Sequence, residues 1–579
     1  MKKSVSLLLT LVILFSLTAC GGGSTQTDTA GSGSAETEDL TSDEPKYGGS
    51  LTIQYDNFNT VFDPAMGESY CYDLWAEHLW CMNWGLDDPD TYAFQENVYT
   101  MDEVQGQIAD QWNWDADTMQ LTVTIRNDIY FQEKNGEYNI FGGRNLTAED
   151  VKYSYDRLTG LGSGFTADTL VYIDSDWASK LSMLDSVEVT DTYTVVFHLN
   201  TASETKLSDF MVAAVDITGP EWDSLTDEQK NDWHYACGTG PYILTDFVAD
   251  NHYTFTRNEN YYDYDERYPE NKLPYLDEII LQKYGDTTSA ISGFIAGDLD
   301  YINVDASLSD SEKNQIQDNV KGVTVQTFAS GAEAMNLKIN SAPFDDINVR
   351  KAMQLAINLE EVNSDYYGYD ELDYAGVWSP SRSDYQCEWS DELLSEYQYD
   401  PDKARELLTE AGYPDGFEFT VAVSSAGNMD VFQMAKSYLA NVGITMNIEG
   451  LSDMMELMIL QSAENDNRCY NDWMGNITSM SDAYQNYKTD RFDWGNYFNN
   501  TDIVDMLTNA YSAQTMDEQA QYAQEAEEYI LSQHWSIALS GMTAKYAYVS
   551  SSVGGLENGE LLTAGVFMGT ITARLWANS

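Results

Sequence analysis

Residues that commonly carry catalysis are present in this sequence, but their spacing matches no common catalytic motif. The 579 residues contain no HExxH zinc motif, no GxSxG nucleophile elbow and no GxxxxGK(S/T) phosphate loop. The histidines are scattered, with no two of them one helical turn apart: His78, His198, His234, His252 and His534. The sequence therefore predicts that the protein is not an enzyme and that it holds no metal and no cofactor.

Acidic side chains dominate the charge of the chain. Asp and Glu number 95 against 29 Lys and Arg, which gives a net charge of −66. A polyanion of this kind repels nucleic acid and anionic lipid head groups, so neither is an expected partner. Carboxylates are also too frequent for any one pair to be singled out as a general acid and base.

Aromatic side chains are frequent in the sequence and could form the walls of a solute-binding site. The chain has 40 Tyr and 14 Trp, and aromatic residues make up 13% of it. Most of them are expected in the core, but a binding cleft needs only a few flat walls with polar groups between them. The indole faces of Trp378, Trp473 and Trp494 suit stacking on sugar rings.

The hydrophobic period predicts the elements that position such residues. From residue 335 to 339 apolar and polar side chains alternate, which indicates a strand. After a break at Pro343, Asp345 and Asp346 suit the N-cap and first turn of a helix. That helix carries apolar residues at positions 349, 352, 353 and 356 on one stripe. Arg350 and Lys351 lie off the stripe and are expected in solvent.

Similar patterns along the chain alternate strands with helices. Strands are predicted at residues 51–55, 121–125, 187–189, 193–199, 417–423 and 444–448. Helices are predicted at residues 146–158, 399–411, 429–442 and 517–530. Thr147 and Asp150 have the spacing of a capping box at the start of the first helix.

The N-terminus predicts export and a lipid anchor. Two lysines precede an apolar stretch at residues 5–17, which is too short for a confident membrane span. Residues 17–20, Leu-Thr-Ala-Cys, resemble a bacterial lipobox, which implies a diacylglyceryl group on Cys20. Residues 21–46 are rich in Gly, Ser and Thr and are expected to form a flexible tether.

The six cysteines indicate no metal or redox motif, since none of them forms a CxxC pair. The spacing of Cys71 and Cys81 permits a disulfide but does not require one.

Four blocks of sequence are more specific than any single element. They are NLKINSAPFDDINVRKAMQLAI from Asn336, LTAEDVKYSYDRL from Leu146, GTGPY from Gly238 and LPYLDEI from Leu273. With the other matching blocks they span nearly the whole chain after the tether. Together they resemble the family 5 extracellular solute-binding proteins, the oligopeptide- and dipeptide-binding type that serve ABC importers.

The resemblance implies an α/β fold of the class II periplasmic-binding-protein type. It would have two lobes with a ligand cleft between them and a small extra domain inserted in the first lobe. The implied bounds are residues 1–20 for the signal peptide, 21–46 for the tether, 47–85, 206–304 and 534–579 for the first lobe, 86–205 for the inserted domain and 305–533 for the second lobe.

The resemblance also suggests which residues contact the solute. In peptide-binding relatives a Trp faces the cleft, and an Asp that follows it pairs with the α-ammonium group of the peptide. Here the corresponding position is Asn476, unless Asp472 or Asp482 takes over, and a neutral amide loses the charge-assisted contact. The full set of expected ligand-binding residues is Tyr55, Asn57, Tyr242, Trp378, Trp473, Gly475, Asn476, Asp482 and Trp494.

Partners and location follow from the same resemblance. A peptide is the favoured solute, an oligosaccharide or a metal complex is the alternative, and membrane permease subunits receive it. The chain is expected to be a monomer on the outer side of the cell membrane, held there by its lipid anchor. An extracellular hydrolase or adhesin is the competing class. The missing nucleophile motif argues against the hydrolase, and the lack of internal repeats argues against the adhesin.

Overall fold

The structure is a computed structural model of the chain. It describes residues 44–56, 58, 60–64, 71–83, 101, 104–161, 180–213, 215–304, 308, 310–369, 371–380, 382, 384–424, 427–451, 468–487, 501–556 and 568–578. The chain divides into two units, Met1–Glu44 and Pro45–Ser579. Every helix and strand discussed below belongs to the second unit. The predicted lipid-attachment residue Cys20 lies outside the described residues.

A seven-stranded mixed sheet is centred on β1 (Ser50–Gln54). Its strand order is β14-β20-β13-β1-β12-β9-β8. β1 runs parallel to β12 and β13, and the other neighbours are antiparallel. The further strands are β8 (Tyr242–Val248), β9 (His252–Arg257), β12 (Glu278–Gln282), β13 (Tyr301–Val304), β14 (Thr324–Ser330) and β20 (Thr543–Val549).

A separate four-stranded antiparallel sheet has the order β4-β5-β7-β6. Its strands are β4 (Ala109–Asp115), β5 (Gln120–Ile125), β6 (Leu184–Asp191) and β7 (Thr194–Leu199). The helix α2 (Ala148–Thr159) covers it, and Tyr155 of α2 packs edge-on against Phe197 of β7. The strands predicted at residues 121–125, 187–189 and 193–199 are therefore confirmed as β5, β6 and β7.

A five-stranded sheet has the order β17-β16-β18-β15-β19. Its strands are β15 (Ala332–Asn336), β16 (Glu418–Val423), β17 (Thr445–Gly450), β18 (Cys469–Met474) and β19 (Ser536–Ala538). The helices of this part of the chain are α8 (Ile347–Ala356), α9 (Leu359–Val362), α10 (Asp391–Tyr397), α11 (Pro401–Glu410), α12 (Met429–Asn441), α14 (Met480–Tyr487), α15 (Thr501–Tyr511) and α16 (Met516–Gln533).

Two large hydrophobic cores correspond to two lobes. One core surrounds the seven- and four-stranded sheets, and the other surrounds the five-stranded sheet. Smaller elements complete the first lobe: β2 (Trp80–Met82), β3 (Val104–Gly106), α4 (Glu204–Met211), α5 (Asp227–Lys230), β10 (Tyr264–Asp265), β11 (Tyr268–Lys272), α6 (Thr287–Ala296), α7 (Asp310–Asn319), β21 (Val553–Gly554), α17 (Met568–Ala573) and β22 (Trp576–Ala577). The α/β, two-lobed fold predicted from the sequence is thus confirmed.

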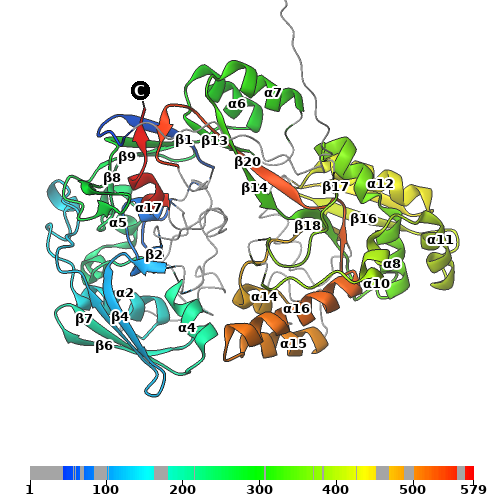
Figure 1. Cartoon of the computed structure of the whole chain (residues 1–579), viewed down its shortest axis with the longest axis horizontal. Helices are drawn as coiled ribbons and strands as arrows, with labels where there is room; N and C mark the ends of the chain where they lie inside the picture. Colours follow the sequence, from blue (N-terminus) through cyan, green and yellow to red (C-terminus); the bar gives the residue numbers. More distant parts are fainter. Residues whose placement is uncertain are drawn as a thin grey trace, which may run out of the picture. The chain divides into compact units, whose positions relative to one another are not determined.

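Two neighbouring strands connect the lobes. β14 and β20 pair along their length in the seven-stranded sheet and lie side by side in Figure 1. Past Gly331, β14 continues into β15, and β19 precedes β20, so the same two segments pair again in the five-stranded sheet. The predicted second lobe, residues 305–533, does not follow the sheets at these two crossings. β14 lies beyond residue 304 but belongs to the seven-stranded sheet, and β19 lies beyond residue 533 but belongs to the five-stranded sheet. Those bounds stay a prediction.

Helix signals in the sequence place several helices correctly. Asp346 is the N-cap of α8, where its side chain accepts a hydrogen bond from the backbone nitrogen of Asn348 at 2.8 Å. Thr147 and Asp150 form the predicted capping box of α2. The helix α16 begins one residue before the predicted range and ends three residues after it.

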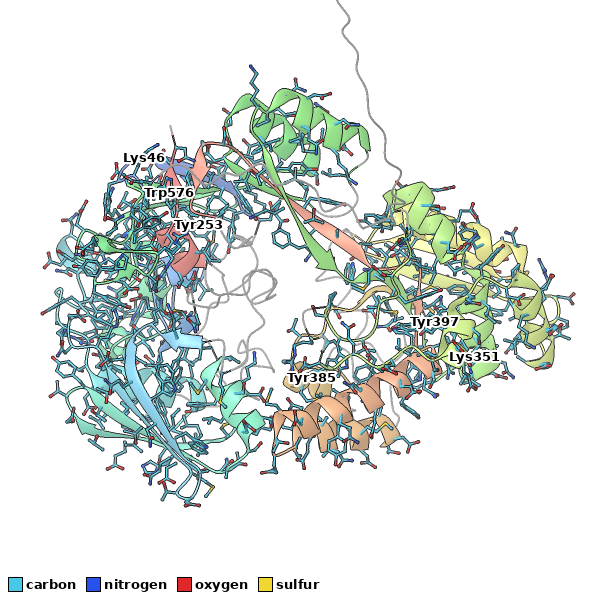
Figure 2. The ribbon with its side chains drawn as sticks, in the orientation of Figure 1. Lys46, Tyr253, Lys351, Tyr385, Tyr397 and Trp576 are labelled. Atoms are coloured by element: carbon cyan, nitrogen blue, oxygen red, sulfur yellow. The ribbon has the colours of Figure 1, made fainter. Side chains whose placement is uncertain are left out.

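The prediction that Arg350 lies in solvent is wrong. Its side chain is buried, and its guanidinium donates to the backbone oxygens of Gln533 at 2.7 Å and Phe344 at 2.9 Å. Gln533 ends α16, and the last carbonyls of a helix lack partners within it. Arg350 is therefore buried because it satisfies a helix end far away in sequence. Lys351, labelled in Figure 2, is half-buried and forms an ion pair with Glu396.

Candidate functional site

The carboxyl ends of β16 and β18 form one edge of the five-stranded sheet. These two strands are parallel, with Val421 beside Cys469 and Ala422 beside Tyr470. β16 ends at Val423, so the last residues of β18 extend past it. Crevices outside the carboxyl ends of parallel strands are common ligand sites in α/β proteins. The predicted residues Trp473, Gly475 and Asn476 lie at this edge.

Trp473 faces a carboxylate that the sequence did not reveal. In the antiparallel pair of β18 and β15 it stands directly opposite Glu333, so both side chains are on one face of the sheet. The Trp473 side chain is half-buried, whereas Glu333 is buried. One carboxylate oxygen of Glu333, Oε1, accepts a hydrogen bond from the backbone nitrogen of Asn428 at 3.2 Å. Because Asn428 is the N-cap of α12, the helix dipole favours the negative charge there.

Asn471 lies two residues before Trp473 and therefore on the same face of β18. Its side chain is fully buried, and its Oδ1 accepts a hydrogen bond from the backbone nitrogen of Ser424 at 2.8 Å. Its Nδ2 has no hydrogen-bond partner among the described residues. We call Glu333, Asn428, Asn471 and Trp473 the edge cluster.

The turn after β18 depends on a glycine. Gly475 has a φ of +76°, which residues with a Cβ rarely adopt, and a Cβ there would also lie 3.3 Å from the Cα of Gly331. The chain then exposes Asn476 and buries Ile477, which bridges to Trp378 in parallel. Gly475 therefore lets the backbone turn at the sheet edge and presents Asn476 to solvent.

Two of the predicted ligand residues, Trp378 and Tyr242, are almost fully buried in this structure. Trp378 is 1% exposed, and its indole nitrogen donates to the backbone oxygen of Ala523 at 3.4 Å. Tyr242 is 0% exposed, and its hydroxyl donates to the backbone oxygen of Thr572 at 3.1 Å. Neither side chain has surface to offer a solute in this structure, so neither belongs to the edge cluster.

The other predicted residues are placed less completely. Tyr55 follows β1 in the other lobe, where it is buried against the rings of Phe58 and Tyr253. Asn57 and Trp494 lie outside the described residues. Asp482 lies on α14, and its side chain is outside the described part of the structure.

Asp472 lies on the face of β18 opposite to Trp473, because neighbouring strand residues point to opposite faces. It is buried against β19, and Ser536 donates a hydrogen bond from Oγ to its carboxylate at 3.1 Å. Burial raises the pKa of Asp472 to about 6, while the hydrogen bond from Ser536 acts in the opposite direction. The structure therefore does not bring Asp472 together with Trp473.

Three members of the edge cluster were not predicted from the sequence. Glu333, Asn428 and Asn471 belong to segments separated by tens of residues and meet only through the strand pairing of β15, β16 and β18. Asn471 alone carried a usable signal, because it precedes Trp473 by two positions within a strand.

The described residues give three further findings. The five described cysteines, Cys71 and Cys81 among them, form no disulfide with one another. Among the described residues, no group of three or more His, Cys, Asp or Glu side chains is placed to hold a metal ion. No helix in the described part of the chain is long and apolar enough to cross a membrane.

Comparison with known proteins finds several that are similar to this chain in amino-acid sequence. The chain is 26% identical over 362 residues to heme-binding protein A of Haemophilus influenzae, a match that covers 60% of this chain and 61% of that protein. It is 25% identical over 347 residues to the glutathione-binding protein GsiB of Pectobacterium atrosepticum, with 59% and 60% covered. The matches thus span less than two thirds of these relatives.

A solved structure shares the fold over almost all of its length. It is the ABC transporter-associated periplasmic binding protein DppA from Helicobacter pylori in complex with the peptide STSA. The TM-score is 0.70 at 20% sequence identity, and the match covers 92% of this chain and 99% of that one.

The family comparison covers most of the sequence and both lobes. Residues 103–517 match the family described as bacterial extracellular solute-binding proteins, family 5 Middle. This range includes the four-stranded sheet and the five-stranded sheet up to β18, and with it the edge cluster. The chain therefore belongs to family 5 of the bacterial extracellular solute-binding proteins.

Proposed function

We propose that this protein captures an extracellular solute at the edge cluster and delivers it to the permease of an ABC importer. The observation that carries the proposal is the half-buried indole of Trp473 beside the buried polar groups of Glu333 and Asn471. A flat aromatic wall next to a few fixed polar groups is what a solute site needs. Membership of a solute-binding family supports the same reading.

A peptide is the solute that we favour. The relative from Helicobacter pylori is described in complex with a peptide, and glutathione, the ligand named for another relative, is itself a peptide. The carboxylate of Glu333 stands opposite Trp473 and supplies negative charge at the edge, where Asn476 is neutral. We infer that Glu333, in place of Asn476, attracts the α-ammonium group of the peptide.

An oligosaccharide is the second candidate, and the same tryptophan is the reason. An exposed indole face stacks well on a sugar ring, and the neutral amide of Asn476 suits hydroxyl groups. A metal complex is a third possibility within the family, since one relative is named for binding heme.

We further propose that the mature protein is a monomeric lipoprotein on the outer face of the cell membrane. The diacylglyceryl group on Cys20 would anchor it, because two acyl chains hold stably where one chain is marginal. Residues 21–46 would act as the tether, and the lobes would divide near the bounds predicted from the sequence. We expect the solute to be bound and released without chemical change.

The first experiment identifies the solute. The protein is purified without refolding, denatured, and the released small molecules are analysed by mass spectrometry. Recovery of peptides in near-stoichiometric amount supports the favoured reading, and recovery of glycans supports the second candidate. If washed protein binds neither a peptide pool nor a glycan pool in calorimetry, both candidates fail.

The second experiment tests the role of Glu333. A charge-assisted hydrogen bond contributes about 1.5–3 kcal/mol, so Glu333→Gln should weaken the binding of free peptides about tenfold to a hundredfold. The same change should leave N-acetylated peptides unaffected, because they lack the ammonium group. Equal losses for both kinds of peptide would show that Glu333 acts only by supporting the fold.

A further inference from the structure

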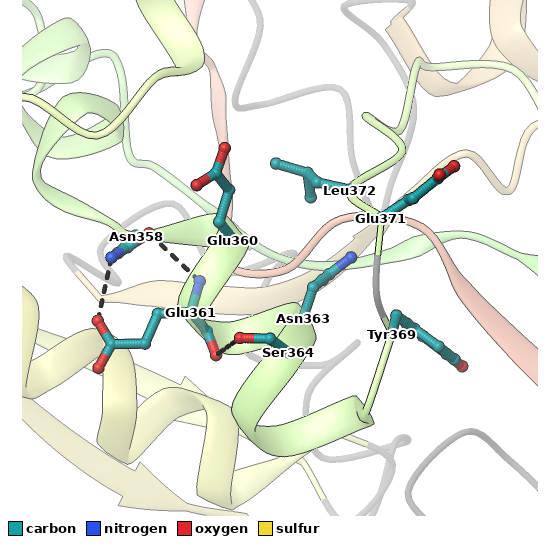
Figure 3. A pocket seen from close by; sticks show the side chains of 8 residues that line it. All are labelled: Asn358, Glu360, Glu361, Asn363, Ser364, Tyr369, Glu371 and Leu372. Atoms are coloured by element: carbon teal, nitrogen blue, oxygen red, sulfur yellow. Dashed lines mark hydrogen bonds between the residues drawn. The ribbon is translucent and has the colours of Figure 1, made fainter.

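A cavity of about 580 Å³ lies in the second lobe, and none of the residues that line it belongs to the edge cluster (Figure 3). It is formed by the start of α9, the π-helical turn η6 (Asn363–Tyr367) and the loop that follows. Its lining is polar except for one leucine: Asn358, Glu360, Glu361, Asn363, Ser364, Tyr369, Glu371 and Leu372. The size is that of an ordinary small-molecule site.

Asn363 is the most informative residue of this lining. Its side chain is only 1% exposed, and its Oδ1 accepts a hydrogen bond from the backbone nitrogen of Gly541 at 2.9 Å. This contact fixes the orientation of the amide, because the nitrogen of Gly541 needs an acceptor. The Nδ2 of Asn363 then points toward Leu372 and Glu371 (Figure 3) and has no hydrogen-bond partner among the described residues. A buried donor without an acceptor calls for an explanation.

The walls around Asn363 carry negative charge. The carboxylates of Glu360 and Glu371 are exposed, and the described residues give them no hydrogen bond and no ion pair. Glu361 is already engaged, since Asn358 donates to its Oε2 at 3.0 Å. Two carboxylates to which the described part of the chain supplies no cation therefore share the cavity with one hydrogen-bond donor of fixed orientation.

We propose that this cavity binds a small organic cation that carries a primary ammonium group and a hydroxyl or carbonyl oxygen, such as an amino sugar. The ammonium group would meet Glu360 and Glu371, and the oxygen would accept the free hydrogen bond of Asn363. A bare metal ion does not explain the site, because an amide nitrogen is a donor and leaves a metal uncoordinated. The inference does not depend on the proposed solute site.

Glucosamine, glucose and cyclohexylamine separate the two contacts. Glucosamine has both groups, glucose lacks the ammonium group, and cyclohexylamine lacks the oxygen. Saturation-transfer NMR with the intact chain measures the dissociation constant of each compound at low and at physiological salt. We expect glucosamine to bind at least about fivefold tighter than either of the others, and less tightly as salt rises. Equal binding of glucose and glucosamine overturns the proposal.

Charge-neutralising variants locate the binding. The double variant Glu360→Gln/Glu371→Gln should weaken glucosamine about fivefold to tenfold, because exposed ion pairs each contribute modestly. The matched control is Glu392→Gln/Glu410→Gln, two exposed glutamates of α10 and α11 in the same lobe. This control should bind glucosamine like the unchanged protein. An unchanged affinity in the first double variant overturns the proposal.

Two more variants complete the test. Asn363→Asp keeps an oxygen for the nitrogen of Gly541 but removes the free donor. Glucosamine and cyclohexylamine should then have about equal dissociation constants. Because both are measured on the same sample, a partial loss of folded protein does not change their ratio. Trp473→Ala should leave glucosamine binding intact. If it abolishes that binding while Glu360→Gln/Glu371→Gln does not, the amino sugar occupies the edge cluster and the proposal is wrong.

Discussion

The two lobes treat the carboxyl ends of their parallel strands in opposite ways. After β1 of the seven-stranded sheet, Tyr55 is 2% exposed and packs against Phe58 and Tyr253, whose own rings stack at 4.8 Å. At the end of β18 in the five-stranded sheet, Trp473 stays half-buried beside Asn471 and Glu333. Among the described residues, the edge of β1 is therefore covered by packed aromatic rings, whereas the edge of β18 carries polar groups and a half-buried indole.

This difference suggests that the edge of β1 contributes to the stability of the fold and that the edge of β18 contributes to solute binding. Packed aromatic rings give rigidity, because each ring in such a pair gains interaction energy beyond the area it buries. Buried polar groups that keep a free donor, such as Nδ2 of Asn471, cost stability unless a ligand completes them. We therefore expect changes near the edge of β1 to lower stability, and changes in the edge cluster to lower affinity.

The largest stability effect should come from Asp63, which follows β1. Its two carboxylate oxygens accept hydrogen bonds from the guanidinium of Arg157 at 2.5 Å each, and both side chains are buried. Asp63→Ala leaves the Arg157 cation buried without this carboxylate and should lower the free energy of unfolding by about 3–5 kcal/mol. Urea denaturation measures the change.

The control for that variant is an exposed ion pair. Asp402→Ala removes the carboxylate partner of Arg405 on α11, where the two side chains are 93% and 48% exposed, and should cost at most about 0.5 kcal/mol. Solute affinity of the folded Asp63→Ala protein should stay within about twofold of the unchanged chain. A large loss of affinity would mean that the edge of β1 also contacts the solute.

A smaller, pH-dependent effect should come from Asp472, on the far face of β18. Burial raises the pKa of Asp472 from 3.8 to about 6, so between these values the folded state binds more protons than the unfolded state. Its contribution to stability is therefore fully present only below pH 3.8 and is lost as the pH rises through 6, at a cost of up to about 3 kcal/mol.

Asp472→Asn removes this titration and keeps an oxygen for the hydroxyl of Ser536. Relative to the unchanged protein, the variant should gain about 2–3 kcal/mol in the free energy of unfolding between pH 4 and pH 7. Denaturation curves of solute-free protein at four pH values test this. Parallel pH profiles for the two proteins would show that Asp472 does not titrate in this range.

The smallest effect compares two helix caps of the second lobe. Asn428 caps α12 inside the edge cluster, and Asp400 caps α11 outside it. Replacing either one by Ala should cost about 1 kcal/mol of stability. Only Asn428→Ala should also weaken solute binding, because an uncapped first turn of α12 no longer fixes the backbone nitrogen of residue 428 that hydrogen-bonds Glu333. Equal affinities for the two variants would remove Asn428 from the site.

Local sequence patterns predicted the elements well and the long-range contacts poorly. The cap Asp346 and the capping box of Thr147 depend on neighbours within one helical turn, so they were readable. The burial of Arg350 depends on a carbonyl of Gln533, 183 residues away, and no local period reveals it. Tyr242 is a core residue for the same reason, since its hydrogen-bond partner Thr572 is 330 residues away.

The candidate site divides along the same line. Resemblance to the family pointed to Trp473 and Gly475, which lie in one short segment at the end of β18. Glu333 reaches Trp473 only through the register of β15 against β18, two strands far apart in the sequence. Strand register is a tertiary property, so a single sequence without an alignment did not supply this carboxylate.

The most direct test of the account is the affinity of Trp473→Ala for the solute that co-purifies with the protein. Calorimetry should show at least about a tenfold loss relative to the unchanged chain, because the stacking face is gone. The matched control is Trp389→Ala, a half-buried tryptophan of the same lobe that packs on Tyr374 and Tyr397. It should bind the solute normally. Unchanged affinity in folded Trp473→Ala protein would contradict the assignment of the edge cluster as the solute site.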